Sequence, residues 1–208
     1  MENKQCRTCR RLGVKLFLKG GRCASPKCAI IKRPYSPGQK GKRPVRGLSE
    51  YGKELAEKQR LKNWYNLRER QFSGYVLKVL GKTAAGDAGV LFIKELETRL
   101  DNVVFRLGFA DSRKQSRQLV NHGHFLVNGK KIDIPSYQVK KGDVVVVRPQ
   151  SKERIYFKNI KQVLKKDQAP AWLKFDPEKM EAQIMGFPTI EEAAPPAELA
   201  SIFEFYSK

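Results

Sequence analysis

The chain has 208 residues, in which 42 lysines and arginines against 21 aspartates and glutamates give a net charge of +21. So large a positive excess repels itself in a compact fold, and a polyanion is therefore the natural partner. No apolar run approaches the roughly 18 residues of a membrane-spanning helix, and no apolar stretch follows the charged N-terminus as in a secretory signal. The composition favours a cytosolic protein that binds nucleic acid, with an anionic membrane surface as the alternative partner.

The charge is distributed unevenly along the chain. Residues 1–49 hold 14 basic residues and one acidic residue, residues 50–175 hold 26 and 13, and residues 176–208 hold two and seven. A solvated surface explains the scattered charges of the middle part, but it hardly explains an opening of 49 residues with a single acid. The N-terminal part is therefore predicted to lie on nucleic acid.

Residues 1–47 contain all four cysteines, six glycines and the segment KRPYSPGQKGKRPVRG, so no lasting helix or strand is predicted there. The cysteines follow the spacing Cys6-x2-Cys9-x13-Cys23-x4-Cys28. Two close pairs in turn-forming segments suit one tetrahedral, structural Zn²⁺ ion, whose binding would supply folding energy that the small segment lacks. An iron–sulfur cluster is the main alternative. Two disulfides would need an oxidising compartment, and free thiols would not explain the clustering.

Helical signals begin at Ser49, a possible N-cap, and continue to about Tyr65. A second helix is predicted from Arg68 to Leu80, followed by a glycine-marked loop at residues 81–89. The strongest pattern predicts a helix over 91–107, with an apolar face of Leu96, Leu100, Val103 and Leu107, and with Glu95 and Arg99 as a supporting pair. A short helix with capping-box spacing is expected from Ser112 to His122.

Strands are predicted next. Phe125–Val127 leads into Asn128-Gly129, a hairpin turn that needs positive φ at both residues, and Lys130–Ile134 returns. A further turn at Lys141-Gly142-Asp143 precedes a strand over Val144–Val147. Another strand is expected near Ile155–Phe157. From Lys174 to the end, short helices joined by prolines are predicted.

The 112–122 helix carries the most specific nucleic-acid signal. Ser116, Leu119 and Val120 share one face, which leaves four polar side chains outside, and arginines one turn apart can each grip a phosphate. Basic groups on a rigid frame suffice for double-stranded RNA, although a solvated helix face is the alternative. The outward set comprises Arg113, Lys114, Arg117 and Gln118, joined by His124, Lys130 and Lys131 at the hairpin. In the opening segment the predicted RNA contacts are Arg7, Arg10, Lys40, Lys42, Arg43 and Arg46.

The stretch LETRLDNVVFRLGFADSRKQSRQLVNHGHFLVNGKKIDIPSYQVKKGDVV closely resembles the RNA-binding module of the universal small-subunit ribosomal protein four family. The cysteine spacing looks like the zinc-bearing bacterial form of that family. The segments SPGQKGKRP, EKQRLKNWYNLRERQF and IFEFYSK also match, so the resemblance covers essentially the whole chain. Two departures are Ser116, where the family usually has a small apolar residue, and Arg68, which replaces a helix-capping Ser.

The fold expected from these patterns and the resemblance is α+β. A zinc-binding basic extension (1–47) would precede a discontinuous helical domain (48–90 plus 176–208), into which an RNA-binding module of helices and a small antiparallel sheet (91–175) is inserted. The apolar end of the chain, Ile202 to Tyr206, motivates packing of the tail on the helices of 48–90.

The resemblance implies a structural constituent of the small ribosomal subunit, located in the cytoplasm. It implies direct binding to the five-prime domain of small-subunit rRNA, nucleation of subunit-body assembly, and contacts with small-subunit proteins five and three near the channel through which mRNA enters. A role in translational accuracy through protein five is also implied. The acidic tail would be repelled by rRNA, so Glu198 and Glu204 are predicted to face that basic neighbour; solubility or helix capping is the alternative.

The same module occurs in pseudouridine synthases, and Arg99-Leu100-Asp101 resembles their catalytic Arg-Leu-Asp. Asp101, however, precedes the module here, and only about 60 residues follow Val147, too few for the large catalytic domain of those enzymes. The chain also lacks a phosphate-cradling glycine loop or a nucleophile elbow. No enzymatic activity and no small-molecule substrate are therefore expected. A non-ribosomal RNA chaperone or a ribosome-recycling factor remains the alternative function.

Overall fold

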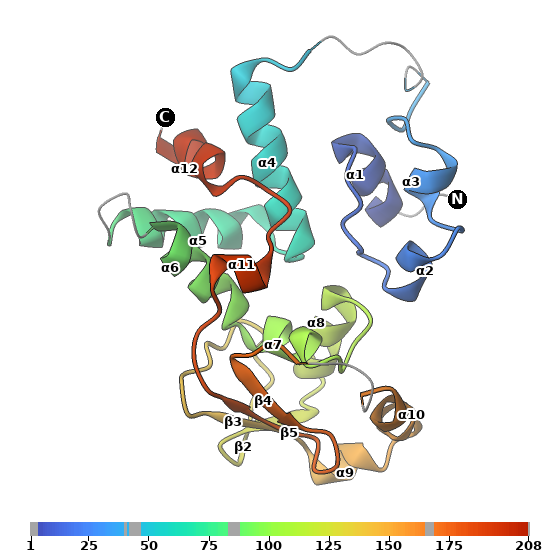
Figure 1. Cartoon of the computed structure of the whole chain (residues 1–208), viewed down its shortest axis with the longest axis vertical. Coiled ribbons are helices and arrows are strands. Elements are labelled where there is room, and N and C mark those ends of the chain that lie inside the picture. The colour runs from blue at the N-terminus through green and yellow to red at the C-terminus, as the bar shows by residue number, and fades with distance from the viewer. Residues whose placement is uncertain (1–3, 40, 42–46, 83–87, 165–168, 208) are drawn as a thin grey trace. The chain divides into compact units, whose positions relative to one another are not determined.

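The computed structural model describes residues 4–39, 41, 47–82, 88–164 and 169–207. They divide into two compact units, the first formed by residues 1–92 with 194–208 and the second by residues 93–193 (Figure 1). The first unit is built of helices and the second contains a sheet, which confirms a mixed α+β fold. In the parts of the chain that are described, no helix combines the length and apolarity needed to cross a membrane.

The N-terminal part of the first unit forms three short helices, so the prediction that residues 1–47 hold no helix was wrong. The first helix has no proline or glycine in KQCRTCRRL, and the segment has a small core of its own because Leu16 and three of the cysteines are buried. The three helices are α1 (Lys4–Leu12), α2 (Gly21–Ala24) and α3 (Ala29–Lys32).

The first unit also contains three longer helices: α4 (Glu50–Trp64), α5 (Glu69–Leu80) and α12 (Leu199–Ser207). Ser49 caps α4 as predicted, because its Oγ accepts a hydrogen bond from the Gly52 N–H at 3.2 Å. Arg68 begins α5 without a side-chain cap, and the helix is held by its buried apolar stripe instead. The C-terminal aromatic residues pack on α4 and α5, with the Phe205 ring 5.4 Å from that of Tyr51.

The helix predicted over 91–107 is two helices, α6 (Ala88–Glu97) and α7 (Leu100–Arg106), so Gly89 lies in a helix rather than in a loop. The break occurs because carbonyl groups of the 135–137 loop accept hydrogen bonds from the first N–H groups of α7, at 2.8 Å for Leu100. The predicted apolar face survives the break, since its four members are all buried. Arg99 is paired with Asp101 at the break.

The second unit contains a five-stranded antiparallel sheet in the order β2-β1-β3-β5-β4. Asn128 and Gly129 have φ angles of 49° and 77°, as the predicted hairpin turn requires. The strands are β1 (Phe125–Val127), β2 (Lys130–Lys131), β3 (Val144–Val147), β4 (Leu173–Asp176) and β5 (Glu181–Ile184).

The strands β4 and β5 correct the prediction that the chain is helical from Lys174 onward, and they correct the domain boundary at Asp176. Residues 176–193 belong to the second unit, and the tail joins the first unit only from Ala194. The physical reason is that Ala182 and Ile184 alternate with exposed positions and are buried when β5 pairs with β3. Pro177, a residue type that ends helices, lies in the turn that connects β4 and β5.

Helices cover the sheet of the second unit. The helix α8 (Arg113–Asn121) matches the prediction, and α9 (Pro149–Lys152) and α11 (Ile190–Ala193) are short. The strand predicted near Ile155 was wrong, because Phe157, Ile160 and Leu164 are spaced for the helix α10 (Ile155–Leu164) and pack on the core. That core joins α7, α8 and α10 to the inner faces of β1, β3 and β5.

Candidate RNA-binding surface and cysteine cluster

The helix α8 is held in one position by its N-terminal end and its inner face. Ser112 Oγ accepts a hydrogen bond from the Gln115 N–H at 3.4 Å, and Gln115 Oε1 accepts one from the Asp111 N–H at 3.1 Å. Ser116 is fully buried, and its hydroxyl donates a hydrogen bond to the backbone carbonyl of Asp101. Ser at this position is therefore satisfied, and α8 is tied to the start of α7.

The outer face of α8 and the β1–β2 hairpin present their polar side chains together. Lys114 and Gln118, one turn apart, are exposed, as are Lys130 and Lys131 on β2. Lys131 lies over the end of α8, because a Cβ added to Gly123 would come within 2.2 Å of its Cε. The fold thus brings the hairpin lysines beside the helix, and rigidly spaced cations of this kind fit the phosphates of an RNA helix.

Arg113 and Arg117 are half-buried, unlike the exposed arginines that were predicted. Arg113 Nε donates to Asn102 Oδ1 at 2.9 Å, and its guanidinium lies 4.5 Å from the centre of the Phe105 ring. Asn102 Nδ2 donates in turn to Glu97 Oε2 at 2.7 Å. Arg113 therefore belongs to a polar network that supports α8, because its hydrogen bond to Asn102 joins α8 to α7.

His124, one of the predicted RNA contacts, is buried. It is 6% exposed, and its Nδ1 lies 2.9 Å from Ser151 Oγ. Burial lowers the pKa of His124, and the nearby positive charge of Arg154 lowers it further, with smaller effects from His122 and Arg148. The ring is buried against Ser151, so it supports the frame.

The surface next to His124 contains basic side chains that the sequence did not single out. Arg154 and His122 are exposed and Arg148 is half-buried, and all three lie close enough to His124 to act on its pKa. Their charge was visible in the sequence, but no local pattern linked residues 148 and 154 to the helix. Only the sheet, which carries the chain back past β1, brings them together.

Arg10, another predicted RNA contact, is also buried. It is 5% exposed, its Nε donates to the carbonyls of Arg33 at 3.1 Å and Tyr35 at 2.9 Å, and its guanidinium lies 4.9 Å from the centre of the Tyr35 ring. This side chain ties α1 to the segment after α3. Arg7 is exposed on α1. The other predicted contacts of the opening segment, Lys40, Lys42, Arg43 and Arg46, lie outside the described residues.

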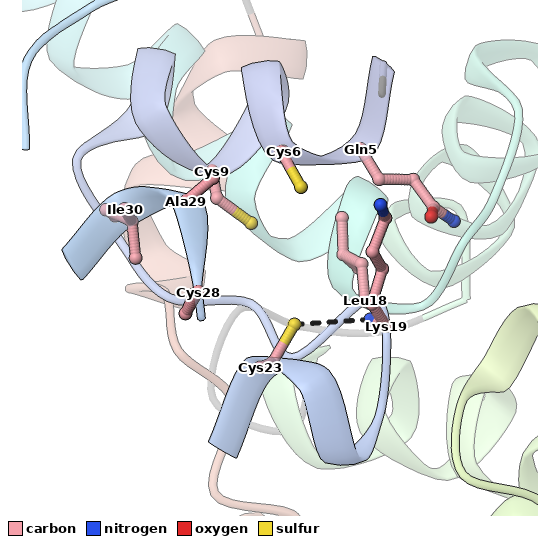
Figure 2. A pocket seen from close by; sticks show the side chains of 9 residues that line it. All are labelled: Gln5, Cys6, Cys9, Leu18, Lys19, Cys23, Cys28, Ala29 and Ile30. Carbon is pink, nitrogen blue, oxygen red and sulfur yellow. Dashed lines mark hydrogen bonds between the residues drawn. The ribbon is translucent and has the colours of Figure 1, made fainter. Parts of the chain in front are cut away.

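The four cysteines line one small cavity, to which α1 contributes Cys6 and Cys9, α2 contributes Cys23 and the start of α3 contributes Cys28. Figure 2 shows the sulfur atoms of Cys6, Cys9 and Cys23 turned toward the same space. Across the described residues, no three or more His, Cys, Asp or Glu side chains are grouped closely enough to hold a metal ion. The structure thus gathers the thiols without bringing them into coordination distance.

Two backbone N–H groups point at these thiols. The Lys19 N–H donates to Cys23 Sγ at 3.3 Å, and the Leu16 N–H donates to the Cys9 thiol. Burial raises the pKa of both thiols, the N–H groups oppose that shift, and the neighbouring cysteines add to it. The effect of the neighbouring cysteines is repulsion between thiolates, and a bound cation would offset it. The donor set of four thiols, three of them buried and two supported by N–H···S hydrogen bonds, fits the chemistry of a structural zinc site.

The Arg99-Leu100-Asp101 sequence does not form a catalytic site. Arg99 Nε and Nη2 donate to the two carboxylate oxygens of Asp101 at 3.0 and 2.6 Å, and their side chains are 1% and 8% exposed. Burial raises the pKa of Asp101, and the Arg99 guanidinium opposes that shift. The carboxylate is paired and enclosed, so no nucleotide can reach it.

The two acids assigned to a protein interface are both exposed. Glu198 precedes α12, and its Oε2 accepts a hydrogen bond from Ser201 Oγ at 3.0 Å, while its N–H donates to Glu57 Oε2 at 3.1 Å. Glu198 therefore has a structural task at the start of α12, whereas Glu204 lies on the exposed face of that helix.

Comparison with known proteins matches two family profiles. Residues 1–97 match the Ribosomal protein S4/S9 N-terminal domain, and residues 98–145 match the S4 domain. Among the relatives named Small ribosomal subunit protein uS4, that of Thermotoga maritima is 47% identical over 204 residues, 98% of this chain and 96% of the relative. Those of Caldicellulosiruptor saccharolyticus and Thermus thermophilus are 48% and 45% identical over 203 residues, with the same coverage.

Proposed function

The chain belongs to the uS4 family of small ribosomal subunit proteins. We propose which parts of it bind rRNA, metal and neighbouring proteins. As a member it is a structural constituent of the small ribosomal subunit in the cytoplasm, it binds rRNA, and it is not an enzyme. The described residues suit a particular region of rRNA, a particular metal and particular protein neighbours.

We propose that the chain binds the five-prime domain of small-subunit rRNA through the outer face of α8 and the β1–β2 hairpin, and that this contact nucleates assembly of the subunit body. The observation that carries the proposal is the placement of Lys131 across Gly123, which brings the exposed hairpin lysines beside the helix that presents Lys114 and Gln118. Arg113 and Ser116 hold that surface rigid from below. A rigid basic frame recognises RNA by phosphate, shape and 2′-hydroxyl contacts.

The test is a filter-binding titration of the full chain on a five-prime-domain rRNA transcript over a range of salt concentrations. Affinity should fall steeply with salt, and the triple variant Lys114→Ala, Lys130→Ala, Lys131→Ala should bind about tenfold or more weakly with a shallower salt slope. Lys174→Ala, which removes an exposed lysine from β4, is the matched control and should bind like the parent. An unchanged affinity in the triple variant would refute this surface.

We propose that the cysteines of the N-terminal part hold one structural Zn²⁺ ion. The support is the shared cavity, the burial of Cys9, Cys23 and Cys28, and the two N–H···S hydrogen bonds. When bound, zinc would link α1, α2 and α3 in a segment with few other core residues. An iron–sulfur cluster is the competing assignment for four thiolates.

The remaining proposal concerns protein neighbours. We propose that the acidic face of α12 contacts small-subunit protein five, that protein three lies nearby at the channel through which mRNA enters, and that the protein-five contact influences decoding accuracy. The support is the exposed Glu204 and the acidic balance of the last 33 residues, which hold seven acidic residues and two basic ones. Exposed charges at an interface set register and partner choice more than affinity.

A further inference from the structure

The loop between α1 and α2 holds an aromatic side chain in a conformation that costs free energy. Phe17 has a φ angle of 52°, in the left-handed region that bulky residues avoid, and its side chain is 52% exposed. A large apolar side chain kept outside the core by a strained backbone is rarely a product of folding stability alone. The combination points to a ligand for the ring.

The loop is fixed on both sides of Phe17. The Leu16 N–H is bonded to the Cys9 thiol and the Lys19 N–H to Cys23 Sγ at 3.3 Å, while the Leu16 side chain is 1% exposed. The Phe17 carbonyl accepts a hydrogen bond from the Gly20 N–H at 3.4 Å. Because its neighbours are anchored inward, Phe17 cannot turn into the core without breaking these contacts.

The charge around the ring indicates the kind of ligand. Lys15 Nζ lies over one face of the Phe17 ring, 5.0 Å from its centre, which leaves the other face for a ligand. Lys19 follows in the same loop and Arg22 in α2. The first 49 residues contain a single acid, so this segment has almost no carboxylates of its own to pair with these cations. An exposed aromatic face beside cations suits a nucleobase with its phosphate, since every base has a face that stacks on an aromatic ring.

We propose that Phe17 is a base-stacking platform on which an unpaired nucleobase of the rRNA rests, with Lys15 binding the adjoining phosphate. This inference rests on the proposed rRNA function and adds a second, aromatic contact far along the sequence from α8. It also gives the cysteine cluster a role in binding, because the N–H groups that surround the thiols are the same groups that hold Phe17 outward.

The experiment compares full-length variants on the five-prime-domain rRNA transcript at one salt concentration. Phe17→Ala and Phe17→Leu should bind about tenfold to a hundredfold more weakly, because stacking is lost in both, and Phe17→Trp should retain affinity. Ile31→Ala, which removes an exposed apolar side chain of the same segment, is the matched control and should bind normally. Full affinity in Phe17→Leu would mean that the ring is only a hydrophobic filler, and would overturn the proposal.

Two further measurements separate stacking from charge and from folding. The salt slope of binding should stay unchanged in Phe17→Ala and become shallower in Lys15→Gln, because only the lysine releases counterions. Phe17→Gly should slow amide exchange in residues 14–24, since glycine accepts positive φ without strain, and yet should weaken RNA binding. A parallel loss of protection and affinity in Phe17→Gly would indicate a structural role and contradict the proposal.

A photoreactive benzoylphenylalanine at position 17 tests the identity of the ligand in assembled small subunits. A crosslink to an rRNA base supports the proposal, and a crosslink to a neighbouring protein alone overturns it. If the parent chain itself fails to bind the transcript, the proposed rRNA target is wrong; if the parent binds and Phe17→Ala binds equally well, only the stacking platform is wrong.

Discussion

Tyr206, two residues before the last residue of the chain, donates a hydrogen bond from its hydroxyl to Glu69 Oε1 at 2.8 Å, across 137 residues of sequence. The same carboxylate accepts from Lys58 Nζ at 2.7 Å and Lys62 Nζ at 2.8 Å. Lys58 Nζ also lies 4.3 Å from the centre of the Phe205 ring. Glu69 thus fastens α12 to α4 and α5, which is why the apolar end of the chain is ordered.

This cluster predicts an acid-sensitive tail. Burial raises the pKa of Glu69, but hydrogen bonds from Lys58, Lys62 and Tyr206 outweigh that effect and lower the pKa from 4.5 to about 2. A depressed carboxylate pKa stabilises the fold fully above pH 4.5, and the contribution is lost as the pH falls through about 2. Because the Glu69 side chain is 47% exposed, solvent screening limits the contribution to about 1 kcal/mol.

Glu69→Gln should therefore lower the free energy of unfolding at pH 7 by about 1 kcal/mol, and the difference from the parent should shrink toward pH 2. Urea denaturation of both proteins across this pH range checks the expectation. Glu178→Gln, at an exposed position on the β4–β5 turn, is the control and should change little. A deficit that persists unchanged at pH 2 would show that the carboxylate charge is not its cause.

Arg113 and Lys114 are adjacent on α8, but replacing each with alanine should have different effects. Arg113→Ala leaves Asn102, which is 2% exposed, without the donor to its Oδ1, and should destabilise the second unit by about 1–3 kcal/mol. Lys114→Ala removes an exposed cation and should leave the free energy of unfolding within about 0.5 kcal/mol of the parent while weakening RNA binding. Equal stability of the two variants would contradict the buried role of Arg113.

Metal content tests the cysteine cluster. Protein purified without oxygen and measured by elemental analysis should contain one zinc ion per chain and no iron. Cys9→Ser should lose the metal and the amide-exchange protection of residues 4–36, because the segment has little other core, while residues 48–207 keep theirs. Stoichiometric iron would refute zinc, and intact protection in Cys9→Ser would show that the segment folds without metal.

Decoding accuracy tests the acidic tail. Glu204→Lys reverses an exposed charge on α12 without removing a hydrogen bond of Glu198, and it should raise stop-codon readthrough in cells that carry only the variant protein. Weakening the contact with protein five should favour closure of the subunit around near-cognate tRNA. Glu178→Lys, an equivalent reversal in the second unit, should leave readthrough unchanged. Normal readthrough in Glu204→Lys, with assembly intact, would exclude this face from accuracy control.

Local patterns account for the elements that the sequence predicted well. Ser49 and Ser112 cap α4 and α8 through hydrogen bonds that span three residues, and Asn128-Gly129 turns the hairpin because both residues accept positive φ. These are interactions between neighbours in sequence, so their residue types suffice. The family of the chain could also be predicted from the sequence, because its motifs are long, continuous segments.

The predictions that failed depended on partners far along the chain. The helix over 91–107 breaks because carbonyl groups of residues 135 and 137 claim its N–H groups, and β5 forms because β3 offers an edge beside it. The sequence also did not show that Arg10 and His124, both predicted RNA contacts, are buried, where they are bonded to the Tyr35 carbonyl and to Ser151 Oγ. In each case a local preference of about 1 kcal/mol is outweighed by hydrogen bonds and burial that only the folded chain supplies.

The sequence by itself determined the family, the polyanionic partner and the cysteine spacing, because charge, motif and spacing are properties of the chain before it folds. The tertiary structure alone decided which cations are available and which are structural. Lys131 reaches the end of α8 across Gly123, whereas Arg113 is held beneath the same helix by Asn102. Exposure is set by what packs above a side chain, and that depends on every element that folds against it.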